Sequence, residues 1–317
     1  MISVNLDRKA QEHRTVFMET LAELIEEDSR TIVLESDLGG ASYLTKLQKY
    51  PDNFINVGVA EANMIGVAVG LNLRGRIPYV HSFSPFVTRR CYDQLFVSAA
   101  YAHNTIKIYG SDPGVCATAN GGTHTSFEDI ALMRAIPNTQ ILDPSDEYCL
   151  KSMIKQTHDS SAITYIRTSR KALSSFYLED QVFELGKAIK LLDGQDILLL
   201  SMGEVMADTY KAALELQKLN IYSSVLDMFS VKPIDSEAII KESQNKKLVV
   251  TIENHSINGG LGSIVAEILS EHQLCVPLLR LGVNEEFGEV GSLDYLKKRY
   301  GIDKDSIVSQ IKERVSK

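Results

Sequence analysis

Segments with helical periodicity alternate with short β-rich runs along this chain, and this alternation limits the folds open to it. The segment RTVFMETLAELIEED repeats apolar side chains at helical spacing, and the strand-like run TIVLES follows directly. The apolar positions are Val16, Phe17, Leu21, Leu24 and Ile25. Because βα units stack into mainly parallel sheets covered by helices, we predict an α/β protein with helices on both faces of each sheet.

The alternation stops once, at KALSSFYLEDQVFEL, residues 171–185. Five strand-like runs follow TIVLES in the first series: FINVGV, IPYVHSF, TIKIYGS, TQILDP and AITYIRT. The second series has DILLLSMG, YSSVLDM, KLVVTIEN and VPLLRLG, with amphipathic helices between them. A chain of 317 residues is long enough for two cores. We therefore predict a domain at 1–170, a linker at 171–185 and a domain at 186–317.

Charge and cysteine content narrow the classes of function. A net charge of -8 argues against a general nucleic-acid surface. The first residues lack the apolar core of a signal peptide, and no apolar run approaches the ~20 residues of a membrane-spanning helix. Four cysteines without CxxC or metal-finger spacing indicate reduced thiols. We expect a cytoplasmic enzyme that acts on small molecules, with neither a nucleic-acid nor a membrane partner.

One carboxylate, Glu61, stands in the almost uncharged stretch NVGVAEANMIGVAVG. Burying a carboxylate without a partner is costly, so its presence needs a reason. One reason is structural, because a glutamate in the first turn of a helix stabilises the positive end of the helix dipole. The other is functional, because a carboxylate in an apolar site forms a strong hydrogen bond to a ring nitrogen. The apolar surroundings favour the functional role.

Two further stretches follow predicted strand ends, where open parallel sheets bind ligands. Phe83 and Phe86 lie in SFSPF, although core packing also explains such aromatics. His124 lies in GSDPGVCATANGGTHTSFEDIALMR, a loop too long and glycine-rich for a simple connection, before a helix predicted to open at Ser126. The glycines fit neither GxGxxG nor a Walker loop, and HExxH and GxSxG are absent from the sequence. These features alone name no enzyme.

The order and spacing of these pieces resemble the C-terminal part of transketolase nearly end to end. VGVAEANMIGVAVGL resembles the segment whose glutamate pairs with N1′ of the aminopyrimidine of thiamine diphosphate. SFSPF resembles the aromatic wall around that ring, and GGTHTSFEDIALMR resembles the loop bearing an active-site histidine. SDLGGAS resembles the loop beside the thiazolium. Residues 1–170 resemble the pyrimidine-binding domain, and residues 186–317 resemble the transketolase C-terminal domain.

The resemblance implies a role for each cofactor residue. Glu61 is expected to hydrogen-bond N1′ and favour the imino tautomer that deprotonates the thiazolium. His124 is expected to donate to the substrate oxygen as charge develops there. Phe83 and Phe86 would enclose the pyrimidine, and Asp37 would face the thiazolium, although an aspartate in such a turn is equally a local cap.

The substrate contacts implied by the resemblance are Arg14, Ser36 and Arg167, all toward the sugar phosphate, with a surface role as the alternative for both arginines. Two positions depart from the family pattern. Asp112 stands where a phosphate-binding histidine is usual, and Asn120 stands where an aspartate contacts the donor hydroxyls. Because a carboxylate repels a phosphate, Asp112 leaves open a donor other than xylulose 5-phosphate.

The sequence lacks the GDG and downstream Asn that hold Mg²⁺ and the cofactor diphosphate in complete transketolases. The resemblance therefore implies the small subunit of a split transketolase, inactive without a large subunit that holds Mg²⁺. It implies a dimer of heterodimers that transfers a two-carbon ketol unit from a ketose, as its phosphate, to an aldose. The β subunit of a 2-oxo acid dehydrogenase and a non-catalytic, partner-binding subunit remain the alternatives.

Overall fold

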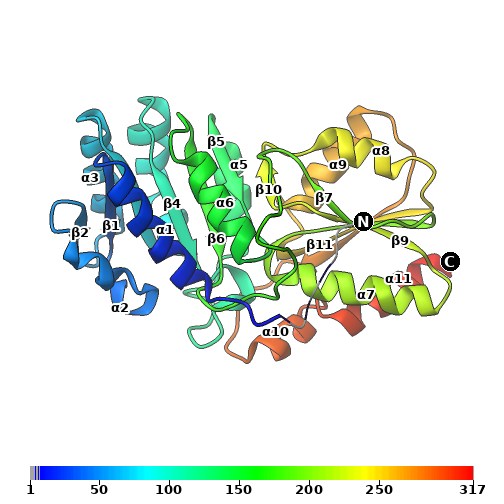
Figure 1. Cartoon of the computed structure of the whole chain (residues 1–317). Coiled ribbons are helices and arrows are strands. Elements are labelled where there is room, and N and C mark those ends of the chain that lie inside the picture. The colour runs from blue at the N-terminus through cyan, green and yellow to red at the C-terminus, as the bar shows by residue number, and fades with distance from the viewer. Residues whose placement is uncertain (1–3, 5, 7, 317) are drawn as a thin grey trace.

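The computed structural model describes residues 4, 6 and 8–316, and it contains two sheets with helices packed on them (Figure 1). The first sheet has seven strands and the second has five. Within each sheet the strands run parallel except for one antiparallel edge strand. The predicted α/β fold with two mainly parallel sheets is therefore confirmed.

The first sheet is formed almost entirely by the first half of the chain. In order across the sheet its strands are β10 (Ser230–Lys232), β5 (Thr139–Leu142), β6 (Ile163–Thr168), β4 (Lys107–Ser111), β3 (Ile77–Phe83), β1 (Thr31–Glu35) and β2 (Phe54–Asn56). Every residue of β1, β4 and β6 is buried, because helices cover both faces of the sheet. This burial explains the near-continuous apolar runs from which these strands were predicted.

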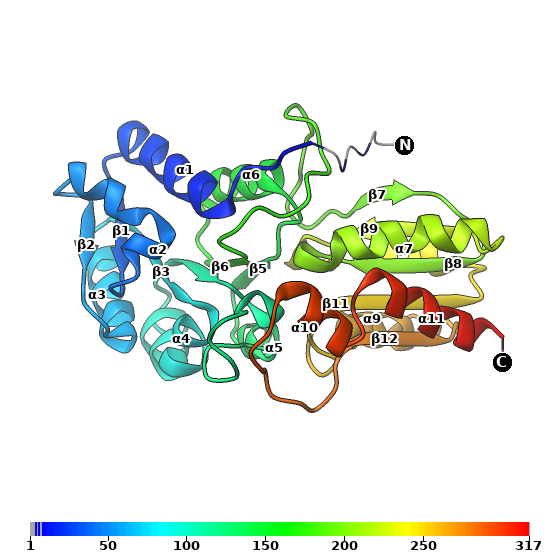
Figure 2. The same ribbon diagram turned by 90° about the horizontal axis from the view of Figure 1, so that it is seen from below.

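Helices cover this sheet on two sides, as Figure 2 shows. On one side are α1 (His13–Glu27) and α6 (Glu147–Thr157), and Phe17 of α1 stacks on Tyr109 of β4 with ring centroids 4.0 Å apart. On the other side are α3 (Glu61–Leu73), α4 (Ser84–Val87) and α5 (Asp129–Ala135). The helix predicted from Ser126 thus begins three residues later.

Shorter elements complete the first half of the chain. They are α2 (Gly39–Ser42), η1 (Leu44–Lys49), η2 (Arg89–Cys91), η3 (Gln94–Tyr101) and η4 (Gly114–Cys116). Residues 171–185 form neither helix nor strand. Over the part of the chain that the structure describes, no helix combines the length and the apolar character that crossing a membrane requires.

The second sheet orders β12 (Leu278–Val283), β11 (Leu248–Ser256), β8 (Ile197–Ser201), β9 (Ser223–Asp227) and β7 (Ile189–Leu192). The helices and turns of this half are η5 (Gly203–Val205), α7 (Met206–Lys218), α8 (Ser236–Ser243), α9 (Leu261–Glu271), α10 (Leu293–Arg299) and α11 (Lys304–Val315). The edge strands β7 and β10 were not predicted, because each is short and has lysine among its few residues.

The strand β10 links the two halves. It lies within the predicted second domain, yet it pairs antiparallel with β5 of the first sheet. The second half of the chain is therefore tied to the first sheet by backbone hydrogen bonds as well as by side chains.

Candidate functional site

The predicted cofactor residues gather where the central strands of the first sheet end. Phe83 is the last residue of β3, and Glu61 is the first residue of α3, which follows the edge strand β2. The loop after β4 brings His124 to the same edge. Carboxyl ends of parallel strands share one edge, so residues far apart in the sequence meet there.

Glu61 is only 3% exposed, and both of its carboxylate oxygens have partners. Oε1 accepts a hydrogen bond of 3.2 Å from the Ser82 hydroxyl. Oε2 accepts one of 2.9 Å from Nη1 of Arg90, whose side chain is 44% exposed. A charge-assisted bond to an arginine makes a buried carboxylate tolerable. Sequence reasoning missed Arg90, because it lies in a short 3₁₀ turn among other polar residues and no pattern marks it.

Aromatic rings form a continuous wall beside this ion pair. The Arg90 guanidinium carbon lies 3.7 Å from the centroid of the Phe86 ring. Phe83 and Phe86 meet edge to face with centroids 6.0 Å apart. The His124 ring lies 5.0 Å from Phe86 and 5.8 Å from Phe83, centroid to centroid. Its Nδ1 is 2.9 Å from the Thr123 hydroxyl, which leaves Nε2 for a ligand.

A polar pocket of about 230 Å³ lies next to the aromatic wall. Its lining includes Asp112 and Asn120, and Arg170 stands between the pocket and the wall. Asp112 accepts from Nε of Arg170 at 2.5 Å and from the Arg170 backbone N–H at 2.8 Å. The guanidinium carbon of Arg170 is 4.9 Å from the Phe83 ring centroid. The ring wall and the pocket are therefore adjacent parts of one site.

Arg14 also lines this pocket. Its Nε and Nη2 each donate to Glu12 at 2.9 Å, and its Nη1 donates to the Ala41 carbonyl at 3.0 Å. The guanidinium also lies 4.0 Å from the Tyr43 ring centroid. The hydrogen bond from Arg14 lowers the pKa of Glu12 below its usual value. Arg14 thus ties the start of α1 to the SDLGGAS loop at the site.

The structure does not bring Arg167, a predicted substrate contact, to this pocket. Arg167 is fully buried, and its guanidinium donates to Asp129 at 2.7 Å, to Asp143 at 2.6 Å and to the Asn254 carbonyl at 3.0 Å. Its side chain points between the two halves of the chain and joins them. Arg170, three residues later and beyond the end of β6, takes the position that was expected of Arg167.

Ser36 and Asp37 also differ in their surroundings. Ser36, a predicted phosphate contact, is 1% exposed, its hydroxyl points to the His81 carbonyl at 3.5 Å, and it is not in the lining of the polar pocket. Asp37 is exposed at the same edge of the sheet and accepts from Nδ2 of Asn56 at 3.1 Å. Of these two residues, only Asp37 is accessible to a ligand.

The second half of the chain holds the glycine-rich loop in place. Asn254 accepts from the Val115 backbone N–H at 2.9 Å and donates to the Pro113 carbonyl at 3.0 Å. The Gly291 N–H donates to the Thr118 carbonyl at 3.0 Å. These bonds fix the loop that lines the polar pocket and carries His124, so the second half of the chain supports the site.

The glycine-rich turn before α9 has its own carboxylate. Glu253 is fully buried and accepts from the backbone N–H groups of Leu261 and Gly262 at 2.7 and 2.9 Å. Two N–H groups at the start of α9 are therefore already hydrogen-bonded within the chain. This agrees with a structural role for the turn.

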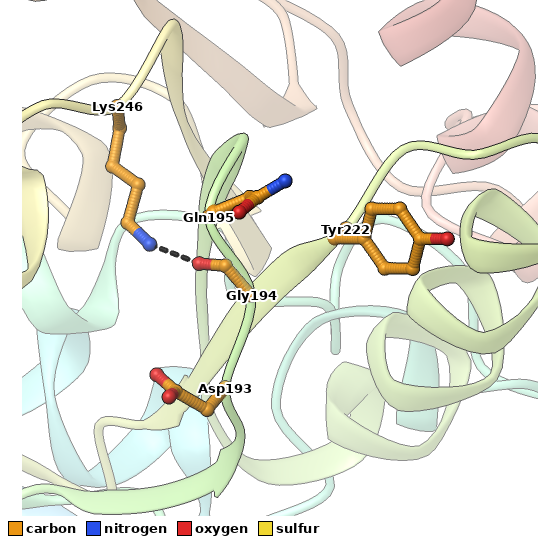
Figure 3. A pocket seen from close by; sticks show the side chains of 5 residues that line it. All are labelled: Asp193, Gly194, Gln195, Tyr222 and Lys246. Carbon is orange, nitrogen blue, oxygen red and sulfur yellow. Dashed lines mark hydrogen bonds between the residues drawn. The ribbon is translucent and has the colours of Figure 1, made fainter.

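Other cavities and clusters lie away from this edge. A pocket of about 570 Å³ at the amino ends of the second sheet is lined by Asp193, Gly194, Gln195, Tyr222 and Lys246, and the Lys246 ammonium donates to the Gly194 carbonyl (Figure 3). Asp28, His158 and Asp159 lie close enough to hold a metal ion. The Arg30 guanidinium already pairs with both aspartates, at 2.7 and 2.9 Å. Neither group shares a residue with the site.

Comparison with known protein families gives two matches that divide the chain. Residues 9–175 match the transketolase pyrimidine-binding domain, and residues 186–307 match the transketolase C-terminal domain. The first match contains the whole aromatic wall and the polar pocket. The second contains the residues that clamp the glycine-rich loop.

Individual relatives are similar over nearly their full length. The subunit SqwH of a 6-deoxy-6-sulfo-D-fructose transketolase from Clostridium sp. (strain MSTE9) is 43% identical, over 95% of this chain and 94% of its own. One of the subunits of an apulose-4-phosphate transketolase from Phocaeicola vulgatus is 36% identical, over 96% and 97%. A solved structure described as a split gene transketolase, inactive beta4 tetramer, has a TM-score of 0.86 and 32% identity, over 96% and 98%. The chain therefore belongs to the transketolase family, in which it groups with the C-terminal subunits of split enzymes.

Proposed function

We propose that this chain is the small subunit of a thiamine diphosphate-dependent transketolase, which transfers a two-carbon ketol unit from a ketose with an anionic terminal group to an aldose. The observation that carries the proposal is the buried Glu61 carboxylate, which accepts a hydrogen bond from the Arg90 guanidinium that lies over the Phe86 ring. It offers a hydrogen-bond acceptor beside an aromatic surface, as a flat nitrogen heterocycle requires.

Arg90 provides a test of whether such a ring suits the space beside Glu61 and Phe86, which we call the ring slot. Its guanidinium is planar and carries N–H donors, and it lies 3.7 Å from the Phe86 ring centroid while it donates to Glu61. An aminopyrimidine has the same features, namely a flat surface and a nitrogen that binds the carboxylate. The residues present therefore fit the pyrimidine of thiamine diphosphate.

Each side chain has a distinct task in the proposed reaction. Thiamine diphosphate, when bound, supplies the carbanion-stabilising thiazolium. Glu61 would hold a proton shared with the ring nitrogen, and Phe83 and Phe86 would exclude water from the ring. Nε2 of His124 would donate to the donor oxygen as negative charge develops, and Asp37 would face the thiazolium.

The polar pocket is the proposed site for the far end of the donor. Arg14 and Arg170 direct guanidinium groups toward it, and Lys171 lies in its lining. Asn120 would contact the donor hydroxyls. The names of the two relatives, one for a sulfo-sugar and one for a sugar phosphate, both describe a substrate with an anionic group. These cations would bind an anionic terminal group on the donor sugar.

A partner is needed to complete the site. The proposal assigns Mg²⁺ and the cofactor diphosphate to a large subunit, in a dimer of heterodimers. The similar solved structure is described as an inactive tetramer of one kind of chain, which supports the expectation that this chain alone does not catalyse the transfer.

The test is reconstitution with the large subunit, expected from a neighbouring reading frame that contains GDG. The assembled complex should transfer the ketol unit from a ketose phosphate or ketose sulfonate to an aldose, and this chain alone should not. Decarboxylation of a 2-oxo acid without ketol transfer would instead identify a 2-oxo acid dehydrogenase subunit. A complex that forms but lacks both activities would identify a non-catalytic subunit.

A further inference from the structure

We infer that Asp112 adapts the donor pocket to a terminal group with a single negative charge, such as a sulfonate, in preference to a doubly charged phosphate. The inference deepens the proposed function and rests on it. It concerns the net positive charge of the pocket, which the carboxylates of Asp112 and Glu12 both lower.

The charged side chains that line the pocket nearly balance one another. Three cations line it, namely Arg14, Arg170 and Lys171, together with the carboxylates of Glu12 and Asp112. The charged side chains of this lining thus carry one excess positive charge. A phosphate ester carries close to two negative charges near neutral pH, whereas a sulfonate carries one, so the sulfonate matches the pocket better.

The contacts of Asp112 fix its charge inside the pocket. It is 5% exposed, and both of its oxygens accept hydrogen bonds from Arg170, at 2.5 and 2.8 Å. Its backbone has a φ of 52°, a left-handed conformation that aspartate and asparagine adopt more readily than most residues. Asp112 therefore cannot turn to solvent when a ligand enters without losing both bonds.

The same contacts determine which hydrogen-bond donors of the two arginines remain free to bind the ligand. Asp112 occupies Nε of Arg170, and Glu12 occupies Nε and Nη2 of Arg14. Within the described part of the chain, Nη1 and Nη2 of Arg170 make no hydrogen bond, so they and the Lys171 ammonium remain to bind oxygens of the terminal group. The second charge of a phosphate would lie near the Asp112 carboxylate, uncompensated by a further cation from this chain.

The test uses the complex of this chain with its large subunit and thiamine diphosphate. Donors are two ketoses with the same carbon skeleton, one ending in a phosphate and the other in a sulfonate, with erythrulose as an uncharged donor. In the wild type the sulfonate donor should have the higher kcat/KM. Asp112→Asn keeps the shape and the backbone conformation, and it should raise kcat/KM for the phosphate donor on the order of tenfold, with a change of less than about threefold for the sulfonate donor.

The matched control is Asp159→Asn, which makes the same change of net charge at the opposite end of the sheet and should leave the ratio of the two donors unchanged. A wild type that prefers the phosphate donor, or a ratio that Asp112→Asn shifts by less than about twofold, would overturn the inference while ketol transfer itself persists. Absence of transfer from all three donors, erythrulose included, would overturn the proposed function instead.

Discussion

Nη1 of Arg90 lies 2.9 Å from Oε2 of Glu61, and these two residues form an ion pair in which only one partner is buried. Glu61 is 3% exposed, whereas the Arg90 side chain is 44% exposed and rests on Phe86. The pair is therefore asymmetric. Loss of Arg90 leaves a buried carboxylate with only the Ser82 hydroxyl, but loss of Glu61 leaves a cation that water can solvate.

Glu61→Gln should abolish most of the ketol transfer by the assembled complex, with a decrease in kcat of about 100-fold or more. The amide cannot take up the proton that the proposed mechanism requires at this position, although it fills the same volume. Steady-state transfer assays would measure the loss, and gel filtration with the large subunit should show unchanged assembly. Glu128→Gln is the matched control, since Glu128 pairs with the neighbouring Arg89 outside the ring slot. Turnover within twofold of wild type would contradict the role of Glu61.

A double-mutant cycle between Arg90→Met and Glu61→Gln should show a coupling free energy of about 1 kcal/mol. Arg90→Met keeps an apolar contact with Phe86 but leaves the Glu61 charge unpaired, and the second substitution then removes that charge. The free energies of unfolding in urea, for the four forms of the chain, give the coupling. The same cycle on Arg89 and Glu128, which are both about 40% exposed, should give a smaller value. Equal coupling free energies in the two cycles would contradict the prediction that burial of Glu61 strengthens its ion pair with Arg90.

Arg167→Met should reduce the free energy of unfolding by about 3–5 kcal/mol. The substitution leaves two buried aspartates, Asp129 and Asp143, without their cation, and burial already raises the pKa of Asp143 to about 6. Urea unfolding followed by circular dichroism measures the loss. Arg299→Met is the control, because Arg299 lies on the surface with Glu286, and it should have a far smaller effect. A stable Arg167→Met chain with a raised KM for the donor would restore Arg167 as a substrate contact.

Asp227→Asn should change how stability depends on pH. Burial raises the pKa of Asp227 from 3.8 to about 7, so the folded state holds a proton that the unfolded state has released between these values. The contribution of Asp227 to the stability of the wild type therefore falls as pH rises from about 4 to about 7, and it is constant above that range. Asp227→Asn removes this dependence, so its stability relative to wild type should rise over the same range, on the order of 3 kcal/mol in total.

Urea unfolding of both forms at several pH values from about 5 to about 8, the range in which proteins are generally most stable, would test this. Asp193→Asn is the control and should show no such rise, because the hydrogen bond from Lys190 lowers the pKa of Asp193 below 3.8 and its contribution to stability is lost only in more acidic solution. Parallel curves for wild type and Asp227→Asn would mean that Asp227 is ionised in the folded chain at all these pH values.

Local patterns were sufficient for much of the fold. Helical periodicity at 14–28 predicted α1, and apolar runs such as IPYVHSF predicted the buried central strands. Since carboxyl ends of parallel strands meet at one edge, Glu61, Phe83, Phe86 and His124 could be assigned to one candidate site from their positions after strand ends. The antiparallel edge strands β7 and β10 escaped prediction, because three or four residues with lysine among them carry no clear period.

The α/β class and the family resemblance could be read from the sequence, and so could the grouping of Glu61, Phe83, Phe86 and His124 at one edge, since each depends on order along the chain. Three findings required the folded chain: Arg90 pairs with Glu61, Arg170 rather than Arg167 lines the pocket, and β10 joins the first sheet. Arg167 lies in β6 and is buried against Asp129, Asp143 and Asn254, whereas Arg170 lies beyond the end of that strand and lines the pocket. Contacts between segments far apart in the sequence determine how each of these side chains is buried, and local sequence patterns do not reveal such contacts.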